Sequence, residues 1–135
     1  MVYMGHLLAV AVALAQYPPI TGTDPVSQLY TQAAEIRSGS PDLELIVFPE
    51  IHLCGDADTA EDANAWLVAA AEPLDGPRMR ALSQVAADLK VWLIPGSVPE
   101  RADDGRTFNT EVVFNPAGEL VASYRKVFPW RPYEA

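Results

Sequence analysis

The stretch Leu45-Ile46-Val47-Phe48-Pro49-Glu50 decides the fold and points to a candidate functional residue. It begins with a short apolar run containing β-branched side chains, which is typical of a strand buried on both faces. Proline cannot donate a hydrogen bond within a sheet, so the strand is expected to leave the sheet at Pro49. Glu50 then lies at the carboxyl end of a buried strand, the edge at which open α/β sheets bind ligands. A partly desolvated carboxylate there suits a general base, although the simpler interpretation is a glutamate in an ordinary loop.

Apolar and helical patterns on both sides of this stretch predict a mixed α/β fold with helices stacked on a sheet. Strands are predicted at residues 7–15, 43–48, 91–94, 110–114 and 120–124, with a hairpin loop at 115–118. The first helix is predicted to begin at Asp24-Pro25, because aspartate is a good N-cap and proline fits the first helical position. A second helix is predicted over 60–71. A third, amphipathic helix begins at Pro77, with its apolar stripe at Met79, Leu82, Val85, Ala86 and Leu89.

The apolar run at 7–15 has a second interpretation, as part of a secretory signal peptide. Ala13-Leu14-Ala15 has the small-x-small pattern of a cleavage site, but no Lys or Arg precedes the run. Its nine residues are also too few to span a bilayer. We therefore expect a central first strand that stays in the mature protein, no membrane association, and a cytoplasmic location. The single cysteine, Cys54, excludes an intrachain disulfide and is compatible with a reducing compartment.

Length and charge exclude some classes of function. The 135 residues are sufficient for one domain with a hydrophobic core. The net charge is −9, from 18 acidic and 9 basic residues. We expect no nucleic-acid partner, because a phosphate-binding face needs clustered Lys and Arg.

The segment 56–75 is acidic and contains no basic residue. Thr59 followed by Asp62 resembles a capping box, which predicts a solvated helix beginning there. A calcium loop is the alternative, because the segment starts with Asp56 and Asp58. It lacks the glycine at the sixth position and the glutamate at the twelfth that such loops use, so we favour the helix and expect no metal.

A second motif lies near the end of the chain. Tyr124-Arg125-Lys126-Val127-Phe128-Pro129-Trp130 is followed by Glu134, eight residues after Lys126. Between the two motifs come Gly76-Pro77 at a helix start, Ile94-Pro95-Gly96-Ser97 at a strand end, and Phe108-Asn109-Thr110 at the next strand start. In this order, over nearly all of the chain, the motifs resemble the N-terminal half of the nitrilase superfamily, the carbon–nitrogen hydrolases. The spacing from Lys126 to Glu134 looks most similar to the aliphatic-amidase and formamidase branch.

The resemblance implies a fold and a chemistry. The fold is the N-terminal half of a four-layer α-β-β-α sandwich, so residues 1–135 form a single partial domain without the later part that carries the nucleophilic cysteine. The family's site combines a Glu, a Lys and that Cys. Glu50 matches the general base, Lys126 matches the cation that stabilises the tetrahedral intermediate, and Glu134 matches a supporting glutamate. The implied activity is thiol-dependent hydrolysis of a small amide or nitrile, without cofactor or metal.

Two further expectations follow from this interpretation. Because both motifs end strands, the Glu50 and Lys126 side chains are expected to approach within about 3–4 Å at a shared cleft. Because the partner sheet of the sandwich is missing, one apolar sheet face is expected to be exposed, and we expect a homo-oligomer. The alternative to an enzyme part is an inactive truncated relative that binds a small amide or pairs with another chain.

Three other chemistries remain open. Cys54 lies near His52, and a Cys–His pair can form a nucleophile, although a lone buried cysteine is more often a small hydrophobe. Glu50, His52 and Cys54 could bind zinc, with no fourth ligand in view. Finally, four aromatic residues near the second motif are equally compatible with a pocket wall and with the core, namely Tyr124, Phe128, Trp130 and Tyr133.

Overall fold

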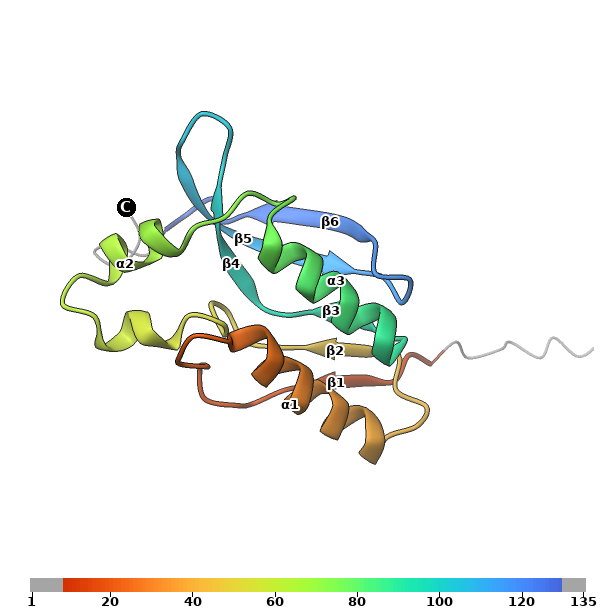
Figure 1. The fold of residues 1–135 in the computed structure, drawn as a ribbon. Helices are drawn as coiled ribbons and strands as arrows, with labels where there is room; N and C mark the ends of the chain where they lie inside the picture. Colours follow the sequence, from red (N-terminus) through yellow and green to blue (C-terminus); the bar gives the residue numbers. More distant parts are fainter. Residues whose placement is uncertain (1–8, 130–135) are drawn as a thin grey trace, which may run out of the picture.

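The computed structural model describes residues 9–129 of the chain (Figure 1). Within this range, six strands form one sheet. The strands are β1 (Val12–Leu14), β2 (Leu45–Val47), β3 (Trp92–Ile94), β4 (Ser97–Arg101), β5 (Thr107–Phe114) and β6 (Leu120–Arg125). The helices are α1 (Pro25–Gly39), α2 (Ala63–Ala70) and α3 (Pro77–Leu89), with a short 3-10 helix, η1 (Gly55–Thr59). The mixed α/β class predicted from the sequence is confirmed.

The sheet topology brings two strand ends to the same edge. Strands β1, β2 and β3 are parallel. Strand β5 runs antiparallel to β3 and β4 on one side and to β6 on the other. Consequently β2 and β6 run in the same direction, and the residues that follow their carboxyl ends, including Glu50 and Lys126, can meet.

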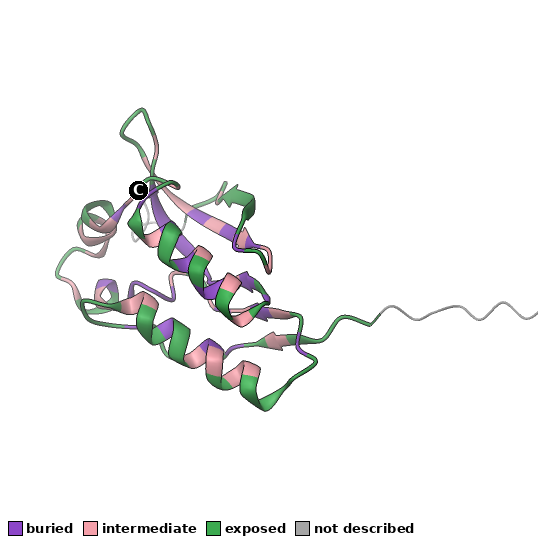
Figure 2. Cartoon of the chain, turned by 45° about the vertical axis from the view of Figure 1, so that its right-hand side comes forward, coloured by how far each residue is buried: buried purple, intermediate pink, exposed green. Residues whose placement is uncertain are grey.

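The two long helices, α1 and α3, lie side by side on one face of the sheet (Figure 1). Helix α1 begins as predicted, because the Asp24 side chain accepts a hydrogen bond from the Ser27 N–H at 3.2 Å. The predicted stripe of α3 is also confirmed, with Leu89 half-buried and its other members buried. These helices cover the sheet residues Ile46, Leu93, Val112 and Phe114, all fully or almost fully buried (Figure 2).

The opposite face of the sheet is uncovered by the described residues, and we call it the open face. Successive side chains of a strand point to opposite faces, so Val12, Leu14 and Trp92 point away from the helices and are exposed. In β2 only Ile46 is buried, while Leu45 and Val47 are half-buried. The prediction that this strand is buried on both faces is therefore wrong for these residues, because helices pack on one side only.

The clearest departures from the predicted elements are at the first strand, at β4 and at the start of α2. The strand predicted at 7–15 is shorter, and β1 is an edge strand paired with β2 alone; residues 7 and 8 lie outside the described range. Strand β4 was not predicted, and it contains Pro99, a residue that is disfavoured within a sheet. Pro99 is nevertheless accommodated, because β4 lies at the edge of the sheet. The Pro99 carbonyl points away from β5 and accepts from the Glu72 N–H at 3.2 Å, so the nitrogen that lacks a hydrogen also points away from β5.

The capping box predicted at Thr59 is also wrong. Asp62 caps α2 instead, accepting from the Ala65 N–H at 2.9 Å. The Thr59 hydroxyl donates to the Asp56 carbonyl within η1. In residues 9–129, no group of three or more His, Cys, Asp or Glu side chains is arranged to hold a metal ion. In that same range, every helix is too short or too polar to cross a membrane.

Candidate active site

Glu50 and Lys126 form an ion pair at the edge of the sheet. The Lys126 Nζ donates to Glu50 Oε1 at 2.8 Å, which confirms the predicted approach of the two side chains. Asn109 Nδ2 donates to the same carboxylate oxygen at 2.7 Å. In addition, the backbone N–H of Lys126 donates to the Asn109 carbonyl at 2.8 Å. This bond to β5 fixes the position of the Lys126 backbone.

The turn that presents Glu50 is strained and tightly packed. Ile51 has a φ of 54°, which is a genuine outlier for a β-branched residue. Its N–H donates to Ser97 Oγ at 3.1 Å. At Gly96, whose φ is +85°, an added Cβ would lie 1.9 Å from the Pro49 carbonyl oxygen. The turn after β3 therefore holds the backbone on both sides of Glu50, and only glycine allows this close approach.

Glu50 is more exposed than the sequence predicted. Its side chain is 55% exposed and that of Lys126 is 31% exposed, because the described residues leave the open face uncovered. Glu111 lies nearby on β5, two residues along from Asn109 and on the same face. Burial, and then the negative charge of Glu50, raise the pKa of the Glu111 carboxyl.

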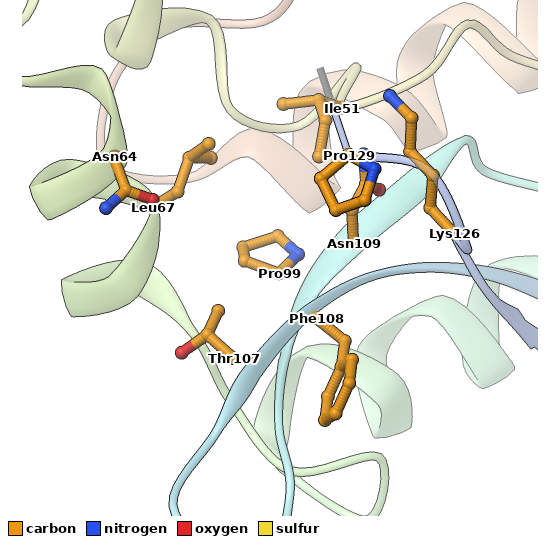
Figure 3. A pocket seen from close by; sticks show the side chains of 9 residues that line it. All are labelled: Ile51, Asn64, Leu67, Pro99, Thr107, Phe108, Asn109, Lys126 and Pro129. Carbon is orange, nitrogen blue, oxygen red and sulfur yellow. The ribbon is translucent and has the colours of Figure 1, made fainter. Parts of the chain in front are cut away.

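A cavity of about 70 Å³ adjoins the ion pair (Figure 3). It is lined by Ile51, Asn64, Leu67, Pro99, Thr107, Phe108, Asn109, Lys126 and Pro129. Helix α2 supplies one wall, and β5 supplies another (Figure 3). The lining is mostly apolar, with the Lys126 and Asn109 side chains beside it.

The aromatic residues suggested as a pocket wall do not form it in the described part of the chain. Tyr124 and Phe128 are 62% and 86% exposed, and neither lines the cavity. Phe108 does line it. Trp130, Tyr133 and the predicted site residue Glu134 lie outside the described residues, so the role of Glu134 stays a prediction.

Cys54 and His52 are turned into the core rather than towards Glu50. Cys54 is 2% exposed, and burial raises the pKa of its thiol to about 11, with Arg78 lowering it and Asp56 raising it slightly. His52 is fully buried and stacks on Phe48, and its Nε2 pairs with Gln32 Oε1 at 2.9 Å. Burial lowers the pKa of the His52 imidazole. A buried thiol with a raised pKa is a poor nucleophile, which argues against the local Cys–His alternative. Within residues 9–129, Glu50, His52 and Cys54 do not form a group that could hold a metal ion, so the zinc alternative is not supported there.

Asn109 is the residue whose contribution the sequence did not indicate. It was noted only as part of the motif Phe108-Asn109-Thr110. Its place opposite Lys126 depends on the register between β5 and β6, which pairs Thr110 with Arg125. Local sequence carries no signal for that register.

Comparison with known proteins shows which family the chain belongs to. The sequence model of the carbon–nitrogen hydrolase family matches residues 11–135. A formamidase of Bacillus cereus is 30% identical over 128 residues, which cover 90% of this chain and 37% of the formamidase. Nit3 of Saccharomyces cerevisiae, a member of branch 10 of the nitrilase superfamily, superimposes with a TM-score of 0.71 at 26% identity. That match covers 88% of this chain and 44% of Nit3.

A carbon–nitrogen hydrolase of Helicobacter pylori has the same fold, with a TM-score of 0.76 at 18% identity over 92% of this chain and 41% of that one. The chain thus spans less than half the length of each of these relatives. It belongs to the carbon–nitrogen hydrolases of the nitrilase superfamily and corresponds to the N-terminal portion of their fold.

Proposed function

We propose that this chain is the N-terminal part of a thiol-dependent amidase that converts a small amide to an acid and ammonia. The observation that carries the proposal is the contact between Glu50 and Lys126 beside a mostly apolar cavity. A carboxylate and an ammonium held together at a strand edge can serve as the general base and the oxyanion stabiliser in amide hydrolysis. The formamidase relative supports an amide as substrate.

The proposed reaction has two steps. A cysteine thiol from the remainder of the domain gives its proton to Glu50 and attacks the amide carbon, forming a carbon–sulfur bond. The Lys126 ammonium stabilises the oxyanion, and Glu50 returns the proton to the departing ammonia. Glu50 then takes a proton from water, and the water attacks the thioester carbon. The carbon–sulfur bond breaks, Glu50 returns the proton to the cysteine sulfur, and the acid leaves. No cofactor or metal enters either step.

The cavity next to Lys126 is the proposed site for the acyl part of the substrate. If the carbonyl oxygen lies at Nζ of Lys126, the acyl group is directed towards Ile51, Leu67 and Pro99. These side chains are apolar and the cavity is small, about 70 Å³, so we propose short, uncharged acyl groups.

The test is ammonia release by the protein expressed from its complete reading frame, with formamide, acetamide and propionamide as substrates. Glu50→Gln and Lys126→Ala should each lower kcat/KM by at least ~100-fold, the usual scale for a general base or an oxyanion donor. Glu35→Gln and Lys90→Ala, at exposed positions on α1 and after α3, are the matched controls and should leave kcat/KM unchanged. The 135-residue chain alone should be inactive. Full activity of the Glu50→Gln variant would refute the proposed role.

The open face favours a second candidate, an inactive relative that works by association. Val12, Leu14 and Trp92 expose apolar surface there, and exposed apolar surface of this kind drives association. A reading frame that ends without a further cysteine would favour this candidate. Light scattering of the 135-residue chain should then find a homo-oligomer, and a clean monomer at micromolar concentration would contradict it.

A further inference from the structure

Asn109 contacts both members of the ion pair at once. Its backbone carbonyl accepts from the Lys126 N–H at 2.8 Å, and its Nδ2 donates to Glu50 Oε1 at 2.7 Å. The backbone bond continues the β5–β6 pairing one residue beyond Thr110 and Arg125. Asn109 and Lys126 are therefore opposite each other, and their side chains lie on the open face.

The two donors occupy the same oxygen of Glu50. Asn109 Nδ2 and Lys126 Nζ both bind Oε1, and within residues 9–129 no hydrogen bond to Oε2 is seen. A carboxylate has about four lone-pair sites over its two oxygens. Two donors on one oxygen fix the plane of the carboxylate, and in the described part of the chain the second oxygen stays open to a proton.

We propose that Asn109 is a positioning residue that holds Oε1 of Glu50 so that Oε2 can take the proton of the attacking thiol. This inference rests on the proposed role of Glu50 as the general base. A neutral amide suits the task, because it stabilises the ionised carboxylate without titrating itself. The Lys126 ammonium is a point charge on a flexible side chain and would not fix the orientation of the carboxylate alone. The Asn109 side chain is short and is attached to the hydrogen-bonded backbone of β5.

The other charged and titratable groups around Glu50 either stabilise or destabilise its ionised carboxylate. Lys126, at the end of β6, stabilises the carboxylate, and Glu111, on β5, opposes it as a like charge. Tyr124, on β6, is paired with Glu111 and lies on the same face. From the turn after β3, Ser97 presents a neutral hydroxyl that is bonded to the Ile51 N–H. Asn109 and Glu111 therefore affect the ionised carboxylate in opposite senses.

The first test is the pH dependence of kcat/KM in the complete protein. Asn109→Ala should lower kcat/KM about 10-fold at neutral pH, and should move the acidic limb of the profile upward by roughly half a unit to one unit, because the carboxylate loses a donor. Asn109→Asp keeps the shape but replaces the donor with a negative charge, so the limb should move further. Asn115→Asp, the same change at the far end of this hairpin, keeps the acceptor that binds the Ala117 and Glu119 N–H groups and loses only the donation to Glu119 Oε2. Because it lies far from Glu50, it should change neither quantity. A purely structural role would lower kcat/KM at every pH and leave the limb in place.

The second test does not depend on activity. Carbon-13 labelling of the glutamate carboxyls, with Glu50→Gln to assign the signal, gives the titration midpoint of Glu50 by NMR in the same protein. Asn109→Ala should move this midpoint upward by the same amount as the limb. A moved midpoint in a protein that hydrolyses no amide would sustain the positioning role and reject the proposed function. An unmoved midpoint in both Asn109 variants, each with a native circular dichroism spectrum, would overturn the positioning role whether or not the enzyme is active.

Discussion

Two glutamates bind to opposite faces of the β5–β6 hairpin, and each accepts hydrogen bonds from one neutral and one cationic side chain. They differ in how far their carboxylates are exposed. Glu50, on the open face, is bound by Asn109 and Lys126. Glu100, on the other face, is bound by the residues adjacent to those two in the sequence, Thr110 and Arg125. This follows from strand geometry, because successive side chains point to opposite faces.

The difference lies in how many carboxylate oxygens are occupied and how far each is buried. Arg125 donates to both oxygens of Glu100, at 3.0 and 2.6 Å, and the Thr110 hydroxyl adds a bond of 2.6 Å. The Glu100 side chain is only 5% exposed. The hydrogen bond from Arg125, with one from Thr110, holds the pKa of Glu100 below its ordinary value despite burial. A planar guanidinium binds both oxygens of a carboxylate, whereas the donors to Glu50 among residues 9–129 bind only one of its oxygens. Glu100 is thus a structural anchor, and Glu50 retains capacity for chemistry.

The largest expected effect is on stability, and it separates the two glutamates. Glu100→Gln should lower the free energy of unfolding by about 2 kcal/mol, because a buried carboxylate loses its charge-assisted hydrogen bonds to the half-exposed Arg125. Glu50→Gln should lower it by less than about 1 kcal/mol, because this pair is exposed. Urea denaturation of the two variants measures both values. Equal losses of unfolding free energy in the two variants would contradict the distinction between Glu100 as a structural residue and Glu50 as a reactive one.

Gly96→Ala should come next, and its main effect should be on the turn that presents Glu50, because the clash is with Pro49 while Glu100 lies four residues further along β4. The added Cβ would collide with the Pro49 carbonyl in a backbone conformation that alanine adopts at a cost, so we expect a loss of more than about 1 kcal/mol. Thr110 on β5 and Arg125 on β6, which bind Glu100, are not part of this turn. Gly39→Ala, at the end of α1 where an added Cβ meets nothing within 4 Å, is the control and should be neutral or slightly stabilising. Thermal unfolding of both variants, with kcat/KM in the complete protein, provides the comparison.

The pH dependence of stability should differ in sign between the two faces. The pKa of Glu100 is lowered from the ordinary 4.5, so its contribution is complete above that value and is lost as the pH falls through the folded-state pKa. The difference in unfolding free energy between wild type and Glu100→Gln should therefore shrink below about pH 4.5. The pKa of Glu111, on the open face, is raised, so Glu111→Gln should become relatively more stable as the pH rises. Denaturant unfolding from pH 3 to 7 measures both trends, and parallel curves would contradict the assignment.

The smallest expected effect concerns Cys54, which lies outside both glutamate sites. Cys54→Ala should leave kcat/KM of the complete protein nearly unchanged, because the thiol is buried and its pKa is raised to about 11. For the same reason, a disulfide reagent should modify Cys54 in the folded 135-residue chain far more slowly than after unfolding in urea. Rapid modification of the folded chain would reopen the local Cys–His alternative.

The sequence by itself determined the elements that depend on neighbouring residues. The strand ending at Pro49, the Asp24 cap and the apolar stripe of α3 were predicted correctly, because proline geometry, capping and helical periodicity act within a few residues. The approach of Glu50 and Lys126 was also predicted, from the resemblance and from the strand that precedes each. Where a local signal had competitors it failed, as at Thr59, where Asp62 provides the cap instead.

Only the tertiary structure decided which of the polar side chains act together. That Asn109 lies opposite Lys126, and Thr110 beside Glu100, follows from the register of β5 against β6 and β4. A slip of one residue would exchange the two faces and give Glu50 the partners of Glu100. The burial of Cys54, the exposure of Glu50 and the existence of β4 likewise depend on contacts between segments far apart in the chain. Such pairing energies are summed over a whole sheet face, and for that reason no short stretch of sequence specifies them.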